Sequence, residues 1–334
     1  MRIGRAIVLV VAGALLGGCG RAHLPSWRGT PEPWTEARFA RKEMSTYRVR
    51  LDRGVPVETV VGRVDSYKIL QGDTLLDVAR AYDLGYNEIV EANPGVDAWV
   101  PPVGTKIVLP TAFVLPCCRY DGLVINIPEM RLYHYRRAPD DPAVLLVETH
   151  PVGLGRTDRR TPRGRFKVRG KTKNPTWVIP ESIRREHIAE DGDHRRSIAG
   201  GHPDNPLGKY RIELTIPYYT IHGTNNPWGA GMPVSHGCAR LYPEDIEHLF
   251  PFVEAGMPVE FTYQAVKAGR RRDGAYLVAH ADVYGMSGSL DAAARKALGR
   301  LDTVVDQKTL RGALSRSRGL PVRVVGEATR GRAS

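Results

Sequence analysis

Residues 218–240, YYTIHGTNNPWGAGMPVSHGCAR, contain one cysteine and two histidines among glycines, asparagines and prolines. A cysteine is nucleophilic as the thiolate, and a nearby imidazole is the usual group that removes its proton near neutral pH. His222 lies 16 positions before Cys238, so the two side chains meet only if the chain reverses direction. The intervening NNPWGAGMP favours turns. The stretch therefore predicts a cysteine-dependent acyl transferase or hydrolase with Cys238 as the nucleophile.

Two histidines compete for the role of base. His236 is two positions from Cys238, and in a strand side chains at i and i+2 share a face, so spacing alone does not choose between His236 and His222. Two other interpretations stay open: a buried structural thiol, and a zinc site formed by His222, His236 and Cys238. Against the zinc site, the chain has no second cysteine pair or HExxH-type helix beside it.

The two ends of this stretch, Ile221-His222-Gly223-Thr224 and Ser235-His236-Gly237-Cys238-Ala239-Arg240, resemble the signature of the L,D-transpeptidases, YkuD-like enzymes of bacterial cell-wall crosslinking. The resemblance extends over about residues 121–263 and implies that family's mixed-sheet β-sandwich. It selects Cys238 as the nucleophile and His222 as the proton acceptor and donor. It implies neither a metal nor an organic cofactor.

The resemblance also implies roles for neighbouring residues. The carbonyl of Gly223 would orient the His222 imidazole, and the backbone N–H groups of Gly237 and Cys238 are candidates for the oxyanion hole. Arg240 would bind a substrate carboxylate through its guanidinium. The remaining members of the expected supporting set, Ser235 and His236, would shape the site.

The flanking sequence fits a mainly β catalytic domain. Short strand-like segments separated by Gly/Pro turns from residue 121 onward predict a β-sandwich or partly open barrel. A helix from Pro243 to near Gly256 is expected to pack behind the site. A polar insert at residues 181–201 is expected to form a lid or rim over the substrate groove. Trp177 and Trp228 are expected either to line the groove or to belong to the core. His187, His194 and His202 are expected to be solvated surface residues and not catalysts.

Residues 65–111 form a separate small module in the sequence. Strand-like YKIL is followed by a Thr74–Asp77 capping box, two short helical segments and the strand-like IVL, which gives the order strand, helix, helix, strand. YKILQGDTLLDVARAY, IVEANPG and VPPVGTKIVLP resemble a LysM domain. That resemblance implies binding to glycans that contain N-acetylglucosamine, such as peptidoglycan. A small α/β spacer without a ligand is the alternative.

The first 19 residues resemble a lipoprotein signal peptide. Arg2 and Arg5 precede an apolar segment that is shorter than the roughly 20 residues of a membrane span. Leu16-Gly17-Gly18 followed by Cys19 resembles a lipoprotein box, which implies lipidation of Cys19 and a periplasmic protein anchored to a membrane, the outer one favoured over the inner. Residues 20–64 are expected to be a linker, with a strand pair near residues 47–61.

The net charge of +12 favours an anionic partner. The chain carries no recognisable nucleic-acid motif, so an acidic wall polymer or a membrane surface fits better. Much of the charge lies in residues 264–334, a basic accessory region in which one strand and two helices are expected. The adjacent Cys117 and Cys118 have a spacing that strains a mutual disulfide, and they are expected to be structural, redox-sensitive or incidental.

Together these features predict an exported L,D-transpeptidase with an N-terminal LysM domain. The family resemblance implies a thioester on Cys238 that an amine resolves, either a diaminopimelate amine in a 3–3 crosslink or a lysine of an outer-membrane protein. The sequence of residues 222–241 most resembles the enterobacterial enzymes that attach the major lipoprotein to the wall. Two alternatives remain: a peptidoglycan L,D-carboxypeptidase or endopeptidase with the same cysteine, and a non-catalytic LysM lipoprotein that binds the wall.

Overall fold

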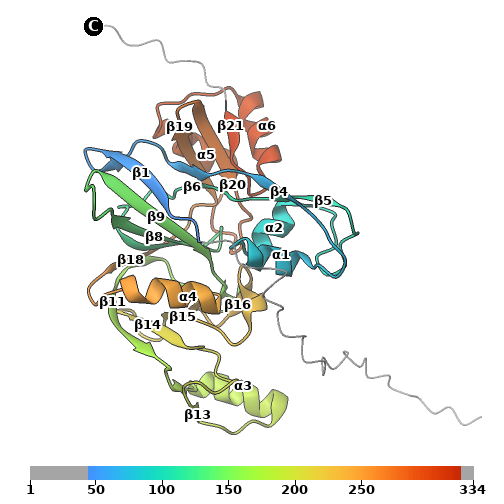
Figure 1. The fold of residues 1–334 in the computed structure, drawn as a ribbon, viewed down its shortest axis with the longest axis vertical. Coiled ribbons are helices and arrows are strands. Elements are labelled where there is room, and N and C mark those ends of the chain that lie inside the picture. Colours follow the sequence, from blue (N-terminus) through green and yellow to red (C-terminus); the bar gives the residue numbers. More distant parts are fainter. Residues whose placement is uncertain (1–43, 325–334) are drawn as a thin grey trace, which may run out of the picture. The chain divides into compact units, whose positions relative to one another are not determined.

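The computed structural model describes residues 44–324 (Figure 1). The expected signal segment, Cys19 and the first part of the linker lie outside the described residues. No helix in the described range is both long and apolar enough to cross a bilayer.

The LysM region has the predicted βααβ order, with β4 (Asp65–Lys68), α1 (Leu75–Ala81), α2 (Tyr86–Ala92) and β5 (Lys106–Leu109). β4 and β5 pair in antiparallel fashion. The predicted capping box is present, because the Thr74 hydroxyl accepts from the N–H of Asp77 and the Asp77 carboxylate accepts from the N–H of Thr74. α2 begins at Tyr86, where the Glu88 carboxylate accepts a 2.7 Å hydrogen bond from the N–H of Gly85.

Ten strands form one large mixed sheet, which confirms the mainly β prediction. In chain order they are β1 (Tyr47–Asp52), β2 (Val55–Pro56), β7 (Gly122–Asn126), β8 (Arg131–Arg137), β9 (Val144–Pro151), β11 (Gly164–Lys173), β14 (Tyr210–Leu214), β15 (Thr220–His222), β17 (Ala239–Arg240) and β18 (Pro258–Thr262). Their order across the sheet is β17-β15-β14-β11-β18-β7-β8-β9-β1-β2.

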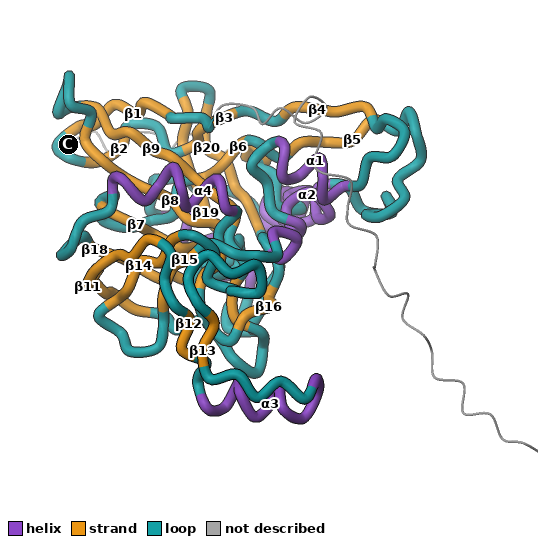
Figure 2. Tube along the Cα trace, turned by 60° about the horizontal axis from the view of Figure 1, so that its bottom comes forward, coloured by secondary structure: helices purple, strands orange, loops and turns teal. Residues whose placement is uncertain are grey.

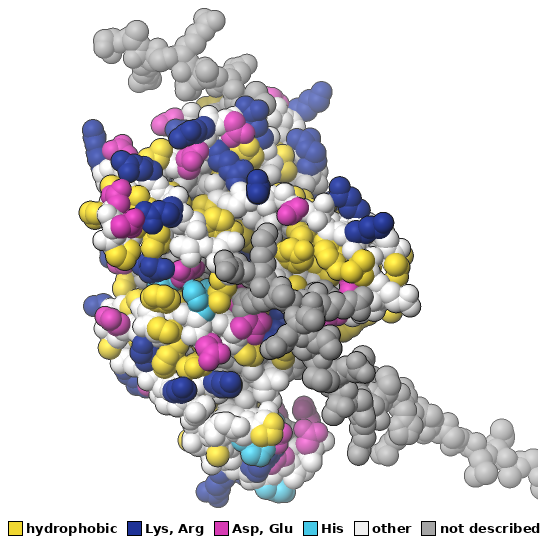
Figure 3. Space-filling model, in the orientation of Figure 1, with side chains coloured by type: hydrophobic (Ala, Val, Ile, Leu, Met, Phe, Trp, Pro, Cys, Tyr) yellow, Lys and Arg dark blue, Asp and Glu magenta, His cyan; other side chains and the backbone are white. Residues whose placement is uncertain are grey.

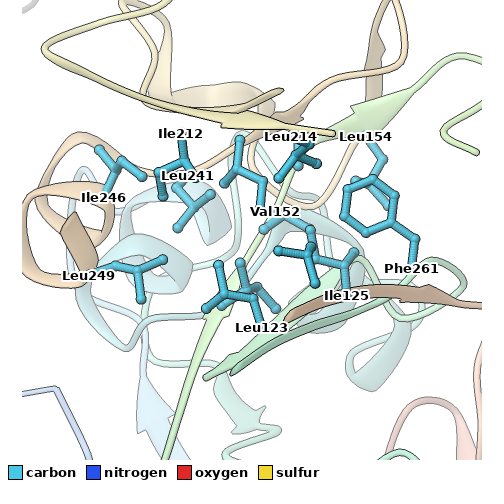
Figure 4. Packing of buried hydrophobic residues seen from close by; sticks show 14 of the residues in the cluster. Leu123, Ile125, Val152, Leu154, Ile212, Leu214, Leu241, Ile246, Leu249 and Phe261 are labelled. Carbon is cyan, nitrogen blue, oxygen red and sulfur yellow. The ribbon is translucent and has the colours of Figure 1, made fainter. Parts of the chain in front are cut away.

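The long strand β11 joins the two halves of this sheet. Its first residues pair with β18 and its last residues with β14, and the register shifts between Val168 and Gly170. Apolar side chains from both halves meet in one core: Leu123 and Ile125 of β7 lie across from Ile212 and Leu214 of β14 (Figure 4). Leu241 and the helix α4 (Pro243–Leu249) complete that core.

α4 is shorter than the sequence predicts. It ends at Leu249 and continues as the 3-10 turn η2 (Phe250–Phe252) instead of reaching Gly256. Pro251 explains the difference, because proline has no amide hydrogen for the next helical hydrogen bond. Ile246 and Leu249 nevertheless lie in the core as expected.

The second half of the expected linker belongs to the folded region. β1 and β2 form the expected strand pair, but β1 also pairs with β9, so residues 47–56 extend the large sheet instead of forming a tether. β3 (Val60–Gly62) then pairs with β6 (Ala112–Val114). These two strands flank the LysM region in the sequence, so both of its ends are fixed by one strand pair.

The C-terminal region contains the expected strand and two helices within a subdomain of its own. Its elements are β19 (Val266–Arg271), β20 (Gly274–Ala279), α5 (Leu290–Gly299), α6 (Gln307–Ser317) and β21 (Val322–Val324). The three strands form an antiparallel sheet, and α5 and α6 contribute to a separate apolar core.

A buried ion pair connects the LysM region to the large sheet. Arg131 on β8 is 0% exposed, and its Nε and Nη2 atoms each lie 2.6 Å from a carboxylate oxygen of Glu88 on α2. Nη2 also donates to the carbonyl of Asp83 at 2.7 Å. A buried guanidinium without its carboxylate is strongly unfavourable.

We therefore expect Glu88→Gln to destabilise the protein by about 3–5 kcal/mol, because the Arg131 charge stays buried without compensation. Urea unfolding of the purified protein measures this loss. Asp140→Asn is the matched control: Asp140 pairs with Arg48 at 2.9 Å on the surface, and we expect no measurable change there. Equal effects of the two substitutions would contradict the assignment of Arg131–Glu88 as the connecting contact.

Candidate active site

The two halves of the HGT…SHGCAR motif come together in neighbouring strands. β15 and β17 are parallel, with Ile221 opposite Ala239 and His222 opposite Arg240. Ile221 and Ala239 are both 0% exposed in the core. Because side chains alternate between the faces of a strand, His222 and Arg240 project from the opposite face. Cys238, just before β17, lies on that same side.

A cleft of about 950 Å³ opens on this face. The residues from the motif stretch that line it include Thr220, His222, Ser235, His236, Cys238 and Arg240. The chain reversal required by the 16-residue spacing is made by the 3-10 turn η1 (Pro227–Gly229) and the short strand β16 (Pro233–Ser235), which pairs with β10 (Leu154–Gly155).

The imidazole of His222 is held in its neutral form. Its side chain is buried, and Nδ1 lies 2.7 Å from the carbonyl oxygen of Gly223. Nδ1 donates this hydrogen bond, which leaves Nε2 as the acceptor nitrogen. Burial, together with the nearby charge of Arg240, lowers the pKa of His222 to about 3. The imidazole therefore accepts a proton at neutral pH instead of carrying one.

Cys238 has two polar neighbours of its own. The hydroxyl of Thr220 donates to Sγ at 3.6 Å, and the thiol is 3.6 Å from the carbonyl oxygen of Tyr218. Sequence reasoning missed Thr220. The available signal was its position two residues before His222, because in a strand this spacing places both side chains on one face.

The Ser235–Cys238 turn differs from the expected oxyanion hole. The Ser235 hydroxyl accepts from the N–H of Gly237 at 3.0 Å and donates to the carbonyl of Cys238 at 2.7 Å. The Gly237 N–H is thus engaged inside the loop, and the expected pair of donors reduces to the N–H of Cys238. Gly237 has a φ of 116°, and a Cβ there would lie 2.6 Å from the Tyr219 ring, so a side chain is not tolerated.

His236 points to a different partner. β16 ends at Ser235, so the i and i+2 relation of a strand does not apply between His236 and Cys238. Nε2 of His236 lies 2.8 Å from a carboxylate oxygen of Glu186, and this hydrogen bond lowers the pKa of Glu186. Of the two candidate bases, His222 is the one that the structure leaves with a free acceptor nitrogen on the Cys238 side of the sheet.

Glu186 belongs to the polar insert, which forms one side of the cleft. The insert consists of β12 (Trp177–Val178), α3 (Glu181–Asp191) and β13 (Ser197–Ile198). Figure 2 shows α3 beyond the β12–β13 pair. Trp177 and His187 line the cleft, with ring centroids 5.9 Å apart. The cleft lining does not include Trp228, His194 or His202.

Arg240 is the candidate receptor for an anionic group. Burial lowers the pKa of its guanidinium. Among residues 44–324, no group accepts a hydrogen bond from its Nε. Other arginines of the cleft are paired with carboxylates, such as Arg169 with Glu213 at 3.0 Å. A substrate carboxylate would satisfy Arg240.

The geometry does not favour a zinc site at Cys238. Among the described residues, the group whose ligand atoms converge for a metal is Asp83, His150 and Asp245, away from this cleft. Nδ1 of His222 and Nε2 of His236 are directed to Gly223 and Glu186.

Cys117, Cys118 and Cys238 are all free thiols, and burial raises the pKa of Cys118 to about 12.

The lowered pKa of His222 predicts a pH dependence of stability. In the unfolded chain the imidazole of His222 takes up a proton near pH 6.5, whereas in the folded protein it does so only near pH 3. Stability is therefore lost as the pH falls between these values, by about 1.4 kcal/mol per pH unit. Unfolding free energies at pH 7, 6 and 5 should fall more steeply for wild type than for His222→Asn. Parallel curves would contradict a depressed pKa.

Comparison with known proteins agrees with this geometry. The family model described as the L,D-transpeptidase catalytic domain matches residues 121–261, and the LysM domain model matches residues 67–110. The Escherichia coli protein named "Probable L,D-transpeptidase YbiS" is 35% identical over 279 residues, which cover 79% of this chain and 88% of that protein.

Two further proteins illustrate the range of similarity. "Probable L,D-transpeptidase ErfK/SrfK" of Salmonella typhimurium is 37% identical over 218 residues, 64% of this chain and 68% of the relative. A solved L,D-transpeptidase from Mycobacterium smegmatis aligns with 48% of this chain and 64% of that chain, at 19% identity and a TM-score of 0.31. The match to the catalytic-domain model and the extent of identity to YbiS show that this chain belongs to the L,D-transpeptidase family.

Proposed function

We propose that this protein is a cysteine-dependent L,D-transpeptidase that acts on peptidoglycan tetrapeptide stems. The observation that supports this most directly is the parallel register of β15 and β17, which gives His222 and Arg240 one face beside Cys238. A nucleophile, a neutral base and a cationic receptor thus line one cleft. These are the groups that acyl transfer from a carboxylate-bearing peptide requires.

In the proposed reaction, the thiol proton of Cys238 passes to Nε2 of His222 while Sγ attacks the carbonyl carbon of the diaminopimelate residue in the stem. The N–H of Cys238 stabilises the negative oxygen of the tetrahedral intermediate. That intermediate collapses to a thioester, and the terminal D-Ala leaves as its amine after taking the proton from His222. Arg240 binds a carboxylate of the stem.

An amine then attacks the thioester, gives its proton to Nε2 of His222 and regenerates the thiol. We propose either a diaminopimelate amine of a second stem, which forms a 3–3 crosslink, or a lysine of an outer-membrane protein, which attaches that protein to the wall. Water in place of the amine gives a carboxypeptidase or endopeptidase. Product analysis with and without added amine distinguishes these outcomes.

The LysM region supplies a surface for the glycan. Large apolar side chains are exposed on two loops at one end of this region: Leu70 at 48%, Trp99 at 58% and Val103 at 64%. The loops are adjacent, since Gly104 donates to the carbonyl of Ile69. Figure 3 shows hydrophobic side chains gathered over the LysM region. Exposed aromatic and aliphatic groups of this kind suit the apolar faces of sugar rings.

We further propose that the protein is exported and held at a membrane, the outer one favoured, through lipidated Cys19. This rests on the sequence pattern at residues 1–19 alone. The +12 charge supports attraction to an acidic wall or membrane surface.

Intact-protein mass spectrometry with a carbapenem tests the acyl-enzyme chemistry. We expect one covalent adduct on wild type and none on Cys238→Ala. For His222→Ala, acylation should slow by about 10²–10⁴-fold, because the general base is lost. His202→Ala is the matched control, since this histidine lies outside the cleft lining, and it should acylate at the wild-type rate.

Absence of an adduct on folded wild type would remove Cys238 as the nucleophile. The binding-only interpretation would then become the stronger one. The binding-only interpretation predicts that a strain carrying Cys238→Ala keeps the wild-type cell-wall phenotype. The enzyme interpretation predicts that this strain loses the wild-type phenotype.

Sedimentation with purified sacculi tests the LysM surface. We expect Trp99→Ala to lower the bound fraction several-fold, because it removes the largest apolar group of the exposed loops. The rate of carbapenem acylation should stay unchanged. Val304→Ala, which removes another exposed apolar side chain, 63% exposed in the C-terminal region and outside the cleft lining, controls for nonspecific adhesion. Equal binding by Trp99→Ala and wild type would exclude these loops as the glycan surface.

A further inference from the structure

The peptide unit between Gly237 and Cys238 is held by a residue that does not line the cleft. Thr161 is buried in the loop between β10 and β11, and its hydroxyl donates to the carbonyl oxygen of Gly237 at 2.9 Å. The same hydroxyl accepts from the N–H of Gly155 at 3.0 Å. The Thr161 hydroxyl thus acts as donor and acceptor inside the protein, and the proposed acyl transfer gives it no part.

This contact sets the direction of the oxyanion donor. The peptide bond between Gly237 and Cys238 is trans, and in a trans peptide the C=O and the N–H point in opposite directions. Because the carbonyl of Gly237 is bound to Thr161, the N–H of Cys238 is directed away from Thr161. A rotation of this peptide unit would turn the N–H out of the direction that the oxyanion requires.

The turn needs such a contact because it passes through glycine. Gly237 has a φ of 116°, and with no Cβ the backbone at glycine has wide rotational freedom. The Ser235 hydroxyl binds two neighbouring groups, the N–H of Gly237 and the carbonyl of Cys238. Thr161 binds the carbonyl between them. Rotation would break that bond and leave the carbonyl of buried Gly237 without its donor, which is unfavourable.

The C-terminal region holds Thr161 in turn. The hydroxyl of Tyr284 donates to the carbonyl of Gly155 at 2.7 Å and accepts from the N–H of Thr161 at 3.2 Å. Tyr284 is buried, and its ring belongs to the apolar core of the large sheet. One hydroxyl therefore binds both ends of the loop 155–161.

The segment that carries Tyr284 is fixed by hydrogen bonds of its own. The N–H of Tyr284 donates to the hydroxyl of Tyr263 at 2.9 Å, and that hydroxyl donates to the carboxylate of Asp282. The other carboxylate oxygen of Asp282 accepts from the N–H of Ser287 at 2.8 Å. A continuous set of hydrogen bonds thus runs from the C-terminal region to the catalytic turn.

We propose that Thr161 is a positioning residue of the oxyanion hole and that Tyr284 acts through Thr161, so that the C-terminal region is part of the catalytic unit. The proposal rests on the proposed acyl transfer, in which the N–H of Cys238 stabilises the negative oxygen. Loss of one oxyanion donor costs about 10²–10³-fold in rate. Loss of its orientation costs less, because the N–H is still present.

The kinetics of carbapenem acylation, measured at several concentrations, test the role of Thr161. In Thr161→Val the hydroxyl is lost, and we expect the acylation rate constant to fall about 10–100-fold. The apparent affinity should stay unchanged, because Thr161 does not line the cleft. Thr161→Ser keeps the hydroxyl and should acylate within a few-fold of wild type. Thr149→Val is the matched control: it removes another buried hydroxyl, bonded to the carbonyl of Leu132 at 2.9 Å, and should acylate like wild type.

Alkylation of Cys238 by iodoacetamide separates positioning of the oxyanion donor from damage to the thiol. In this reaction Sγ displaces iodide from a saturated carbon, so no oxyanion forms, and the rate depends on the thiolate. Thr161→Val should therefore alkylate at the wild-type rate across the pH range. Peptide mass spectrometry resolves Cys238 from the exposed Cys117.

Tyr284→Phe tests the part played by the C-terminal region and does not depend on the folding of Thr161→Val. It keeps the ring in the core and removes the hydroxyl, and we expect acylation to slow several-fold. The double variant with Thr161→Val should acylate no more slowly than Thr161→Val alone, because Tyr284 acts through Thr161.

Acylation of Thr161→Val at the wild-type rate, or equal losses in Thr161→Val and Thr161→Ser, would overturn the role of Thr161. Alkylation slowed in parallel with acylation would also overturn it, since the thiol itself would then be disturbed. Wild-type acylation by Tyr284→Phe, or losses that multiply in the double variant, would overturn the link to Tyr284. If wild type forms no adduct at all, the acyl-transfer function fails and this proposal fails with it.

Discussion

The parallel pairing of β15 with β17 is the constraint on which the active site depends. It fixes two residues of the HGT and SHGCAR segments opposite each other and sends Ile221 and Ala239 into the core. A one-residue slip would exchange the faces, and His222 and Arg240 would then point into apolar packing. The buried Ile221 and Ala239 thus secure the register, and the register in turn places the polar side chains in the cleft.

Electrostatics then separates the roles of the two histidines. His222 is buried beside Arg240 and bonded through Nδ1 to a carbonyl, so it remains neutral, as the base of the proposed reaction must be. His236 is bonded to the carboxylate of Glu186, which ties the catalytic turn to α3. The same side-chain type is therefore neutral and available for the proposed proton transfer at one position, and attaches the cleft wall at the other.

Local patterns predicted much of this structure. The Thr74 capping box, the βααβ order and the meeting of His222 with the Cys238 side of the sheet follow from short motifs. Contacts between distant segments were not predictable, because no local pattern encodes them. Examples are the pairing of β1 with β9, the His236–Glu186 bond and the Asp83–His150–Asp245 cluster. The engagement of the Gly237 N–H also required the actual geometry of the turn.

The β3–β6 pair has a consequence for the choice of substrate. These strands flank the LysM region and hold both of its ends, and the Arg131–Glu88 ion pair fixes its interior. The LysM region is therefore an anchored insertion and not a domain on a flexible linker. A glycan strand bound there would lie at a set distance from Cys238. Stem peptides at some sugar positions along the strand would then reach the thiol and others would not, so the spacing of modified stems along the wall would reflect the geometry of this junction.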